Sequence, residues 1–374
     1  MNLADHTTIG LGGPARHFVR ADTEAELIEA VSAADGSGEP VLILGGGSNL
    51  VVADEGFDGT VIQVATVGIT QNAEPGLLTA AAGEEWDAVV AGAIAAGLSG
   101  LECLSGIPGL AGATPIQNVG AYGQEVAQVI TEVRAYDRKD QKIFLMPNER
   151  CDFGYRTSVF RAVPAGSSPE AIPSRGGLGG SSPLASTVGA ANRHLVLGVT
   201  FRLAADPLSA PVSYPELAKT LGIGVGERAK CADVRSAVLE LRRRKGMVID
   251  PADPDTRSVG SFFVNPVLDA AALARVEAIA WARWGEDTTV PRFSAGDGIV
   301  KVPAAWLIER AGFGKGYDPG NGARISAKHT LALVNSGSAS TAALIALARQ
   351  IRDGVRESFG VSLSPEPVLI GVTL

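Results

Sequence analysis

A short apolar run that leads directly into a glycine-rich loop is the feature that most constrains the fold of this chain. Val41–Leu44 is typical of a buried strand, Gly45–Asn49 (GGGSN) follows it without a spacer, and Leu50–Val52 is apolar again. Glu24–Ala33 precedes this strand with apolar side chains at helical spacing, and Thr60–Val64 is a further strand candidate. This order of helix and strands predicts a small βαβ-like unit within an α+β fold.

The loop after the first strand carries donors that suit an anion. Glycines let a chain direct several backbone N–H groups at one phosphate, and Gly45, Gly46 and Gly47 stand here in a row. Ser48 and Asn49 add side-chain donors. The loop contains neither a GK[ST] sequence nor a GxGxxG pattern. Taken alone, it is as compatible with a tight turn as with a phosphate site.

Length and composition limit the class of protein. A chain of 374 residues exceeds one typical core, so two or three domains are expected. Hydrophobic residues make up 46% and charged residues 19%, as is ordinary for soluble enzymes. The net charge of −8, without a long Lys/Arg tract, argues against binding to nucleic acid.

The N-terminal segment, the cysteines and the histidines indicate a cytoplasmic protein without a metal. The N-terminal segment lacks the pattern of a signal peptide, and no apolar run is long enough to cross a bilayer. The three cysteines form no CxxC pair, which fits a reducing compartment. None of the four histidines stands at metal-ligand spacing from another. Neither a metal nor a membrane partner is therefore expected.

Helix and strand patterns continue through the rest of the chain. Glu84–Ala96 indicates a helix, and Val129–Tyr136 and Gln141–Met146 indicate paired strands around a polar turn. Leu195–Leu203 indicates another strand. Further elements are expected as a helix from Asp233 to Lys245, a helix over Thr341–Phe359 and a final strand over Val368–Val372.

A long uncharged loop is the second candidate for ligand binding. Leu104–Gly123 combines prolines, glycines and amide side chains. Such a segment suits a neutral planar ligand held by backbone and amide hydrogen bonds. A loop that only packs on itself is the alternative.

Four charged or hydroxyl side chains stand in settings that suggest a site. Arg156 lies among apolar residues, where a local pair with Asp152 or a substrate carboxylate would compensate its charge. Lys245 continues the apolar line of its helix and should point inward as an anion ligand. Ser261 and Glu366 are ambiguous alone, because most such serines bond to backbone groups and most glutamates lie at the surface.

Six segments, taken in order, resemble the UDP-N-acetylenolpyruvoylglucosamine reductase (MurB) family, and more closely its first type. They read GGGSNLVV, IPGLAGATPIQNVGAYGQE, CDFGYRTSVF, VGSFFVNP, AKHTLALVN and SPEPVLIG. The match extends from Thr8 to Gly371, with a break at a Gly/Ser/Pro-rich stretch over 164–193. Its specificity comes from the recurrence of all six segments in the same order.

The resemblance implies a vanillyl-alcohol-oxidase/PCMH-type FAD-binding fold of two subdomains, plus a separate α+β substrate-binding domain. The subdomains are expected at residues 1–67 and 68–203, the second with a flexible insertion at 164–193. The substrate-binding domain is expected at 214–360. A C-terminal strand at 361–374 would carry Glu366 back toward the flavin site.

Site residues carry over from the matching motifs. The catalytic positions implied are Arg156 of the GYR motif, Ser261 of the GSFF motif and Glu366 of the PE motif. The family often has Glu-Pro-Glu there, whereas Ser364-Pro365-Glu366 leaves one acid. FAD contacts are implied for Gly45, Gly46, Gly47, Ser48, Asn49, Ile107, Pro108, Gly109, Thr114, Gln117, Asn118, Gly120, Ala121 and Tyr122. Substrate contacts are implied for Tyr155, Tyr214, Lys245 and Asn265, of which Tyr214 resembles the tyrosine that folds over the UDP group.

The implied activity is the NADPH-dependent, FAD-mediated reduction of UDP-N-acetylglucosamine enolpyruvate during peptidoglycan synthesis, by a monomer with small-molecule partners only. Two alternatives remain open at this point. An FAD-linked oxidase would share the flavin fold and turn over with oxygen in the absence of NADPH. A non-catalytic UDP-sugar-binding protein would lack bound flavin.

Deletion of most of residues 164–193 is expected to leave activity nearly intact. More than half of these residues are Gly, Ser or Pro, which is typical of a mobile surface insertion. Flavin content and turnover of the purified deletion variant test this expectation, and loss of flavin binding would contradict it.

Overall fold

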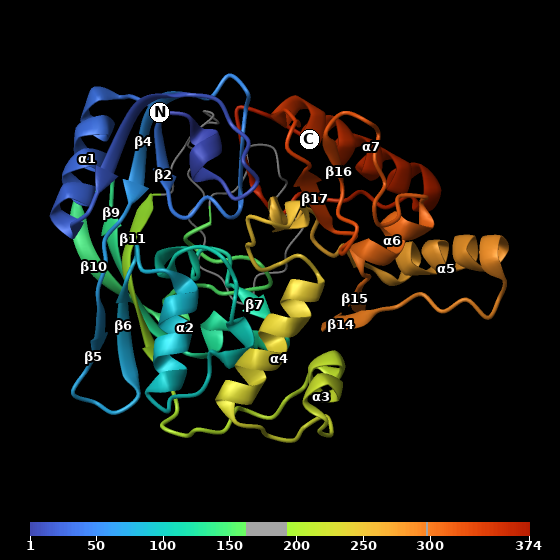
Figure 1. The fold of residues 1–374 in the computed structure, drawn as a ribbon, viewed down its shortest axis with the longest axis horizontal. Coiled ribbons are helices and arrows are strands. Elements are labelled where there is room, and N and C mark those ends of the chain that lie inside the picture. Colours follow the sequence, from blue (N-terminus) through green and yellow to red (C-terminus); the bar gives the residue numbers. More distant parts are fainter. Residues whose placement is uncertain (162–192, 297) are drawn as a thin grey trace. The chain divides into compact units, whose positions relative to one another are not determined.

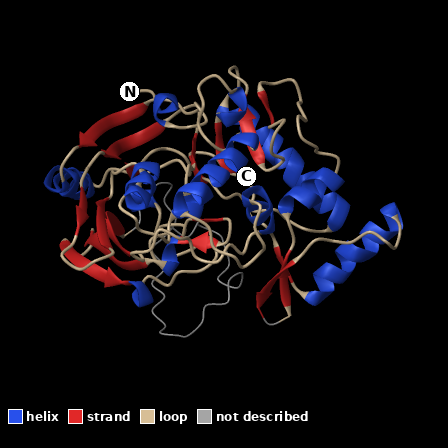
Figure 2. Ribbon diagram, turned by 60° about the horizontal axis from the view of Figure 1, so that its bottom comes forward, coloured by secondary structure: helices blue, strands red, loops and turns tan. Residues whose placement is uncertain are grey.

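The computed structural model describes residues 1–161, 193–296 and 298–374. Nearly all of the stretch expected to be a surface insertion lies outside the described residues. The chain forms two compact units. The first unit comprises Met1–Ala15, Gly46–Phe57 and Leu239–Leu374, and the second comprises Arg16–Gly45 and Asp58–Val238. Both units contain helices and strands (Figure 2).

The described residues of the second unit form a three-stranded sheet, a five-stranded sheet and a two-stranded hairpin (Figure 1). The smaller sheet has the strand order β1 (Ala15–Ala21), β4 (Phe57–Val64), β2 (Val41–Leu44). The larger sheet has the order β10 (Lys142–Pro147), β9 (Ile130–Asp137), β11 (His194–Arg202), β6 (Leu77–Ala81), β5 (Ile69–Gln71), and its neighbouring strands are antiparallel. The remaining elements are α1 (Glu24–Ser37), α2 (Trp86–Ala95), α3 (Pro215–Leu221) and the hairpin of β7 (Gly120–Ala121) with β8 (Gln124–Glu125).

Helix α1 has clear start and stop signals. Thr23 caps its N-terminus in a capping box with Glu26, and Gly38 ends it in the left-handed conformation with φ 71°. Leu27 and Val31 are fully buried in the core of the unit. Helix α1 lies between β1 and β2, which belong to one sheet, and β2 pairs parallel with β4, so the predicted order of helix and strands is present.

Three small sheets build the first unit. Strand β3 (Leu50–Val52) pairs parallel with β18 (Val368–Ile370). The other sheets have the orders β12 (Ser258–Ser261), β17 (Ala332–Asn335), β16 (Ala323–Ile325) and β13 (Val267–Leu268), β15 (Ile299–Lys301), β14 (Phe293–Gly296). The helices are α5 (Ala270–Trp284), α6 (Ala304–Arg310) and α7 (Thr341–Phe359), and α4 (Cys231–Arg244) contains the point at which the second unit gives way to the first.

Helix α7 is bonded at its N-terminus to the segment that follows the glycine-rich loop. The Asp54 carboxylate accepts hydrogen bonds from the N–H groups of Thr341 and Ala342, at 2.7 and 2.9 Å. An anion at a helix N-terminus is stabilised by the helix dipole. Ile351 and Phe359 lie on the buried face of the helix. The segment that follows the glycine-rich loop is thereby held against α7.

Most of the predicted elements are present within a few residues of their expected bounds. The strand Val41–Leu44 and the helix Thr341–Phe359 coincide with β2 and α7. The antiparallel pairing of β9 and β10 is as expected. The sequence reasoning missed α5, although Asp269 caps its N-terminus and alanine dominates its first turn. The predicted division into two flavin subdomains, a substrate-binding domain and a C-terminal strand stays a prediction.

Candidate active site

Ser261 and Glu366 lie on adjacent extended segments of the first unit. The N–H group of Glu366 donates to the carbonyl of Phe262, the residue after Ser261, at 2.8 Å. The N–H group of Val264 donates to Ser364 O at 3.1 Å. These two bonds align the C-terminal segment beside the end of β12. The structure thus brings together two of the three predicted catalytic residues.

A β-bulge determines how Ser261 is presented. Ser258 pairs with Val334, but Ser261 pairs with Ala332, so β12 carries one more residue than β17 between these pairs. Gly260 lies within this bulge at φ 74°, a conformation that glycine adopts without strain. Because alternate residues of a strand face opposite sides, the extra residue redirects the Ser261 side chain. The sequence pattern of a turn entering a strand did not reveal this bulge.

The glycine-rich loop lies beside the same C-terminal segment. The side-chain amide of Asn49 donates to the carbonyl of Glu366 at 3.4 Å. Gly47 has φ 60°, and a Cβ there would lie 1.9 Å from His6 O, so only glycine fits. Gly46 and Ser48 belong with them to the first unit, whereas Gly45 ends the preceding part of the second unit. The loop backbone is therefore held close to one of the predicted catalytic residues.

Arg156 belongs to the second unit and occupies a strained position. Its φ is 56°, in the left-handed region that non-glycine residues rarely adopt. Its Nη2 donates to the carbonyl of Gly120 at 3.2 Å, and its guanidinium lies 5.9 Å from the centre of the Tyr155 ring. Because Ser261 and Glu366 belong to the other unit, the meeting of all three beside a flavin stays a prediction.

The long loop predicted to contact FAD lies in the second unit and is partly buried. The Thr114 hydroxyl donates to Ala111 O at 2.7 Å, and Asn118 is 2% exposed. Tyr122 has φ 49° and packs edge to face on Tyr214, with ring centroids 5.3 Å apart. Tyr214 immediately precedes the first residue of α3, and its side chain is exposed. The other predicted contacts on this loop, which are Ile107, Pro108, Gly109, Gln117 and Ala121, are half-buried.

Lys245 and Asn265 lie in the first unit. Lys245 follows the last residue of α4 and is half-buried, and its role as an anion ligand stays a prediction. The side-chain oxygen of Asn265 accepts a hydrogen bond from the N–H group of Ala304, the first residue of α6, at 2.9 Å. Asn265 therefore has a structural role at the start of α6.

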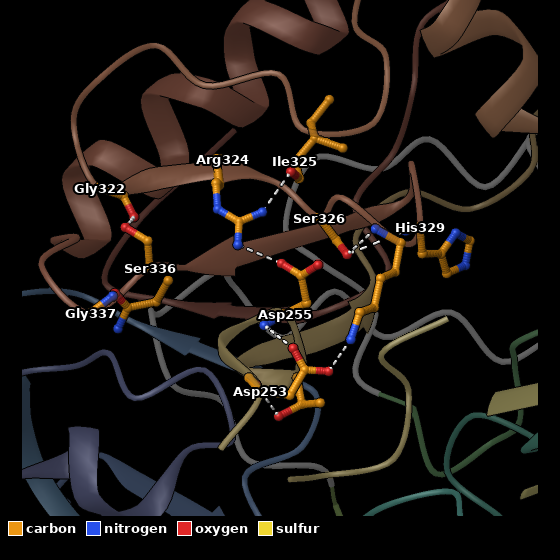
Figure 3. Close-up of polar contacts among 12 residues, drawn as sticks. Asp253, Asp255, Gly322, Arg324, Ile325, Ser326, His329, Ser336 and Gly337 are labelled. Atoms are coloured by element: carbon orange, nitrogen blue, oxygen red, sulfur yellow. Dashed lines mark hydrogen bonds and ion pairs between the residues drawn. The ribbon is translucent and has the colours of Figure 1, made fainter. Parts of the chain in front are cut away.

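Ion pairs that the sequence reasoning did not identify hold the segment that follows α4. Asp255 is buried and accepts from Arg324 Nη2 at 2.5 Å, and Asp253 pairs with Lys328 (Figure 3). Gly246 lies against this cluster, because a Cβ on it would come within 3.2 Å of Asp255 O. The partners are distant along the chain, so no spacing in the sequence could have indicated these pairs.

His329 stands among cations in the same unit. Burial, together with repulsion of the charged form by Lys245, Lys315 and Arg242, lowers the pKa of its imidazole from 6.5 to about 4. The N–H group of His329 donates to the hydroxyl of Ser326 at 3.3 Å. At neutral pH the imidazole is therefore uncharged.

We expect His329 to make the folded protein less stable as the pH falls from 6.5 toward 4. In this window the unfolded chain binds a proton that the folded chain does not, because the folded-state pKa is about 4. The unfolding free energy should fall by as much as about 3 kcal/mol from this group. Urea unfolding at pH 7 and pH 4.5 should show a smaller pH dependence for His329→Gln than for the unsubstituted protein. Equal dependence would contradict the assignment.

The donors of both loops fit the FAD that the fold implies. Residues 46–49 offer backbone N–H groups, a hydroxyl and an amide, which suit a pyrophosphate. Residues 104–123 contain no Asp, Glu, Lys or Arg, and an uncharged loop suits the neutral flavin ring. In the described part of the chain, no helix could span a bilayer and no group of three or more His, Cys, Asp or Glu could hold a metal.

Comparison with known proteins agrees with this fit. Residues 15–144 match an FAD binding domain, and residues 251–370 match the UDP-N-acetylenolpyruvoylglucosamine reductase C-terminal domain. The UDP-N-acetylenolpyruvoylglucosamine reductase of Thermobifida fusca is 50% identical over 100% of this chain and 97% of its own length. That of Saccharopolyspora erythraea is 51% identical over 100% of this chain and 95% of its own length.

A solved structure shares the whole fold. The crystal structure of UDP-N-acetylenolpyruvylglucosamine reductase (MurB) from Thermus caldophilus aligns with a TM-score of 0.59 at 24% identity, over 99% of this chain and 97% of that chain. The fold and the FAD-binding domain define the chain as a flavin-dependent oxidoreductase. The chain belongs to the UDP-N-acetylenolpyruvoylglucosamine reductase family. The predicted family, fold class and flavin cofactor are thereby confirmed.

Proposed function

We propose that this chain reduces the enolpyruvyl group of UDP-N-acetylglucosamine enolpyruvate to give UDP-N-acetylmuramate, with NADPH as the electron donor. Membership of the reductase family, with identity spread over the whole chain, is the observation that carries the proposal. The reaction supplies a precursor for peptidoglycan synthesis. Bound FAD would supply the hydride chemistry, accepting a hydride from NADPH and passing it to the substrate double bond.

Three side chains of this chain would act on the substrate. Hydride addition at the terminal carbon moves negative charge onto the neighbouring carbon and the carboxylate. Arg156 and Glu366, the latter protonated, would stabilise that charge, and preorganised donors of this kind contribute about 3–4 kcal/mol each. The Ser261 hydroxyl would then donate a proton to the carbon, which is a strong base in this state.

The remaining predicted residues would bind rather than react. Gly45–Asn49 would hold the pyrophosphate of FAD, and Ile107–Tyr122 would contact its ring system. Lys245 would bind a phosphate of the substrate or of the nicotinamide nucleotide. The neutral state of His329 and the cations that face it support an anion site at this place.

The partners that we propose are small molecules only, a UDP-sugar and NADPH. The net charge of −8 gives no support for a nucleic-acid partner. We further propose a monomer that works in the cytoplasm, where UDP-sugars and NADPH are available.

NADPH oxidation that depends on the UDP-enolpyruvyl sugar is the test of this function. The purified protein should be yellow, should lose its flavin absorbance with NADPH under anaerobic conditions, and should regain it when the sugar is added. Reoxidation by oxygen alone, with no response to the sugar, would show an oxidase instead. A colourless protein that cannot be loaded with FAD would show that the fold binds sugar without catalysis.

A further inference from the structure

The turn that carries Arg156 requires support from its surroundings. A non-glycine residue at φ 56° costs on the order of 1–3 kcal/mol and persists only where neighbouring contacts hold it. Within the turn, Gly154 and Thr157 exchange backbone hydrogen bonds at 3.0 and 3.2 Å. From outside, Arg161 Nη1 donates to the carbonyl of Arg156 at 2.5 Å.

Asn118 provides a second support from the long loop. Its Nδ2 donates to Gly154 O at 3.0 Å, which anchors the residue at which the turn begins. The same Nδ2 donates to a Glu125 carboxylate oxygen at 2.9 Å, and its Oδ1 accepts from the N–H group of Ala127 at 3.1 Å. Asn118 is 2% exposed, so its amide is committed to these protein partners.

Glu125 determines which way that amide points. A carboxylate only accepts hydrogen bonds, so it selects the orientation in which the Asn118 NH₂ group faces Glu125 and Gly154. The N–H group of Glu125 is in turn bonded to Gln128 Oε1 at 3.2 Å. Glu125 ends the β7–β8 hairpin, and the first strand of that hairpin presents the Gly120 carbonyl that accepts from Arg156. Gly154, at the start of the Arg156 turn, is thus bonded to Asn118, and the Arg156 side chain is bonded to the hairpin that begins two residues after Asn118.

We propose that Asn118 and Glu125 are positioning residues, which fix the Arg156 turn so that its guanidinium is preorganised for the substrate carboxylate. The inference rests on the proposed catalytic role of Arg156. It gives Asn118 a side-chain role distinct from the FAD contact that the family resemblance implies, which its backbone would still be able to make.

The substitution Asn118→Asp tests the proposal with almost no change in volume. It removes both N–H donors and places a carboxylate against Gly154 O and the Glu125 carboxylate. We expect FAD content and the rate of flavin reduction by NADPH to stay within about twofold. Reoxidation of the reduced flavin by the sugar should slow by roughly 100-fold, the effect of a catalytic group displaced by about 1 Å.

A second variant keeps the test valid if Asn118→Asp fails to fold. Glu125→Gln retains the shape of the side chain but replaces a charge-assisted hydrogen bond with a neutral one. It should slow the same half-reaction by roughly fivefold. An unchanged sugar half-reaction in this variant would overturn the role of Glu125.

Asn148 offers a matched control. Its Nδ2, like that of Asn118, donates two hydrogen bonds; they go to the carbonyls of Ala127 and Ile130, both at 2.8 Å, so it supports the same short segment from another side. Asn148→Asp should lower the unfolding temperature by a similar amount and leave the sugar half-reaction within about twofold. If it slows that half-reaction as much as Asn118→Asp does, general loosening explains the effect and the proposal is wrong.

The double variant Asn118→Asp with Arg156→Ala separates the positioning role of Asn118 from the catalytic role of Arg156. If Asn118 acts through Arg156, Asn118→Asp should slow the sugar half-reaction no further once Arg156 is alanine. Additive losses would overturn the positioning role and leave the proposed function intact. A single Arg156→Ala variant with normal sugar reduction would instead overturn the catalytic assignment of Arg156.

Discussion

The Ser261→Ala variant should reduce its flavin with NADPH at close to the normal rate and almost cease to reduce the enolpyruvyl sugar. Reduction of the flavin requires no proton from Ser261, whereas reduction of the sugar requires a proton from Ser261 at the substrate carbon. General acid catalysis contributes roughly 10²–10⁴-fold, and we expect a loss near the upper end because carbon is the proton acceptor. Stopped-flow absorbance of the flavin measures the two half-reactions separately.

Two further variants make this result specific. Ser258→Ala removes a hydroxyl from the same strand, where it accepts a hydrogen bond from the Gly260 N–H group at 3.2 Å. This control should reduce the sugar at close to the rate of the unsubstituted protein. Its loss of rate should be at least about tenfold smaller than that of Ser261→Ala. Ser261→Cys keeps an ionisable proton and should retain part of the activity. Comparable losses in both half-reactions of Ser261→Ala would refute the role of proton donor.

The Glu366→Ala variant should slow sugar reduction by roughly 10²–10³-fold, which is the usual loss when one preorganised donor to a developing charge is removed. Its backbone hydrogen bonds to Phe262 and Asn49 do not involve the carboxyl group, so the C-terminal segment should keep its place. Single-turnover reoxidation of the prereduced protein measures the effect.

A matched glutamate is available in the same unit for comparison. Glu357 lies exposed on α7, and Glu357→Ala should leave both half-reactions unchanged. If Glu366→Ala slows sugar reduction by less than tenfold, or slows flavin reduction equally, Glu366 does not stabilise charge on the substrate.

Much of the local structure could be predicted from the sequence because its causes are local. Thr23 and Glu26 form the capping box of α1, and Gly38 ends it, from positions that the sequence shows directly. The four apolar residues Val41–Leu44 form β2 with the expected bounds. Helix α5 has comparable local signals in Asp269 and its alanine-rich first turn, so it was predictable from the sequence on the same grounds.

The candidate site likewise has features with local causes, which could be predicted, and features with long-range causes, which could not. The order of motifs identified Arg156, Ser261 and Glu366 as candidates, since residue type and flanking residues are properties of the chain. The backbone conformations of these residues could not be predicted from the sequence. The left-handed φ of Arg156 depends on contacts from Asn118, which is far along the chain.

The sequence by itself determined the family, the flavin cofactor and most helices and strands, and it supplied the candidate residues of the site, because motifs and short-range patterns carry that information. Only the tertiary structure decided that Glu366 lies beside the end of β12, that a bulge at Gly260 redirects Ser261, and that Asn118 supports the Arg156 turn. The physical reason is that hydrogen bonds between distant segments depend on the packing of the whole unit, and no periodicity along the chain records them.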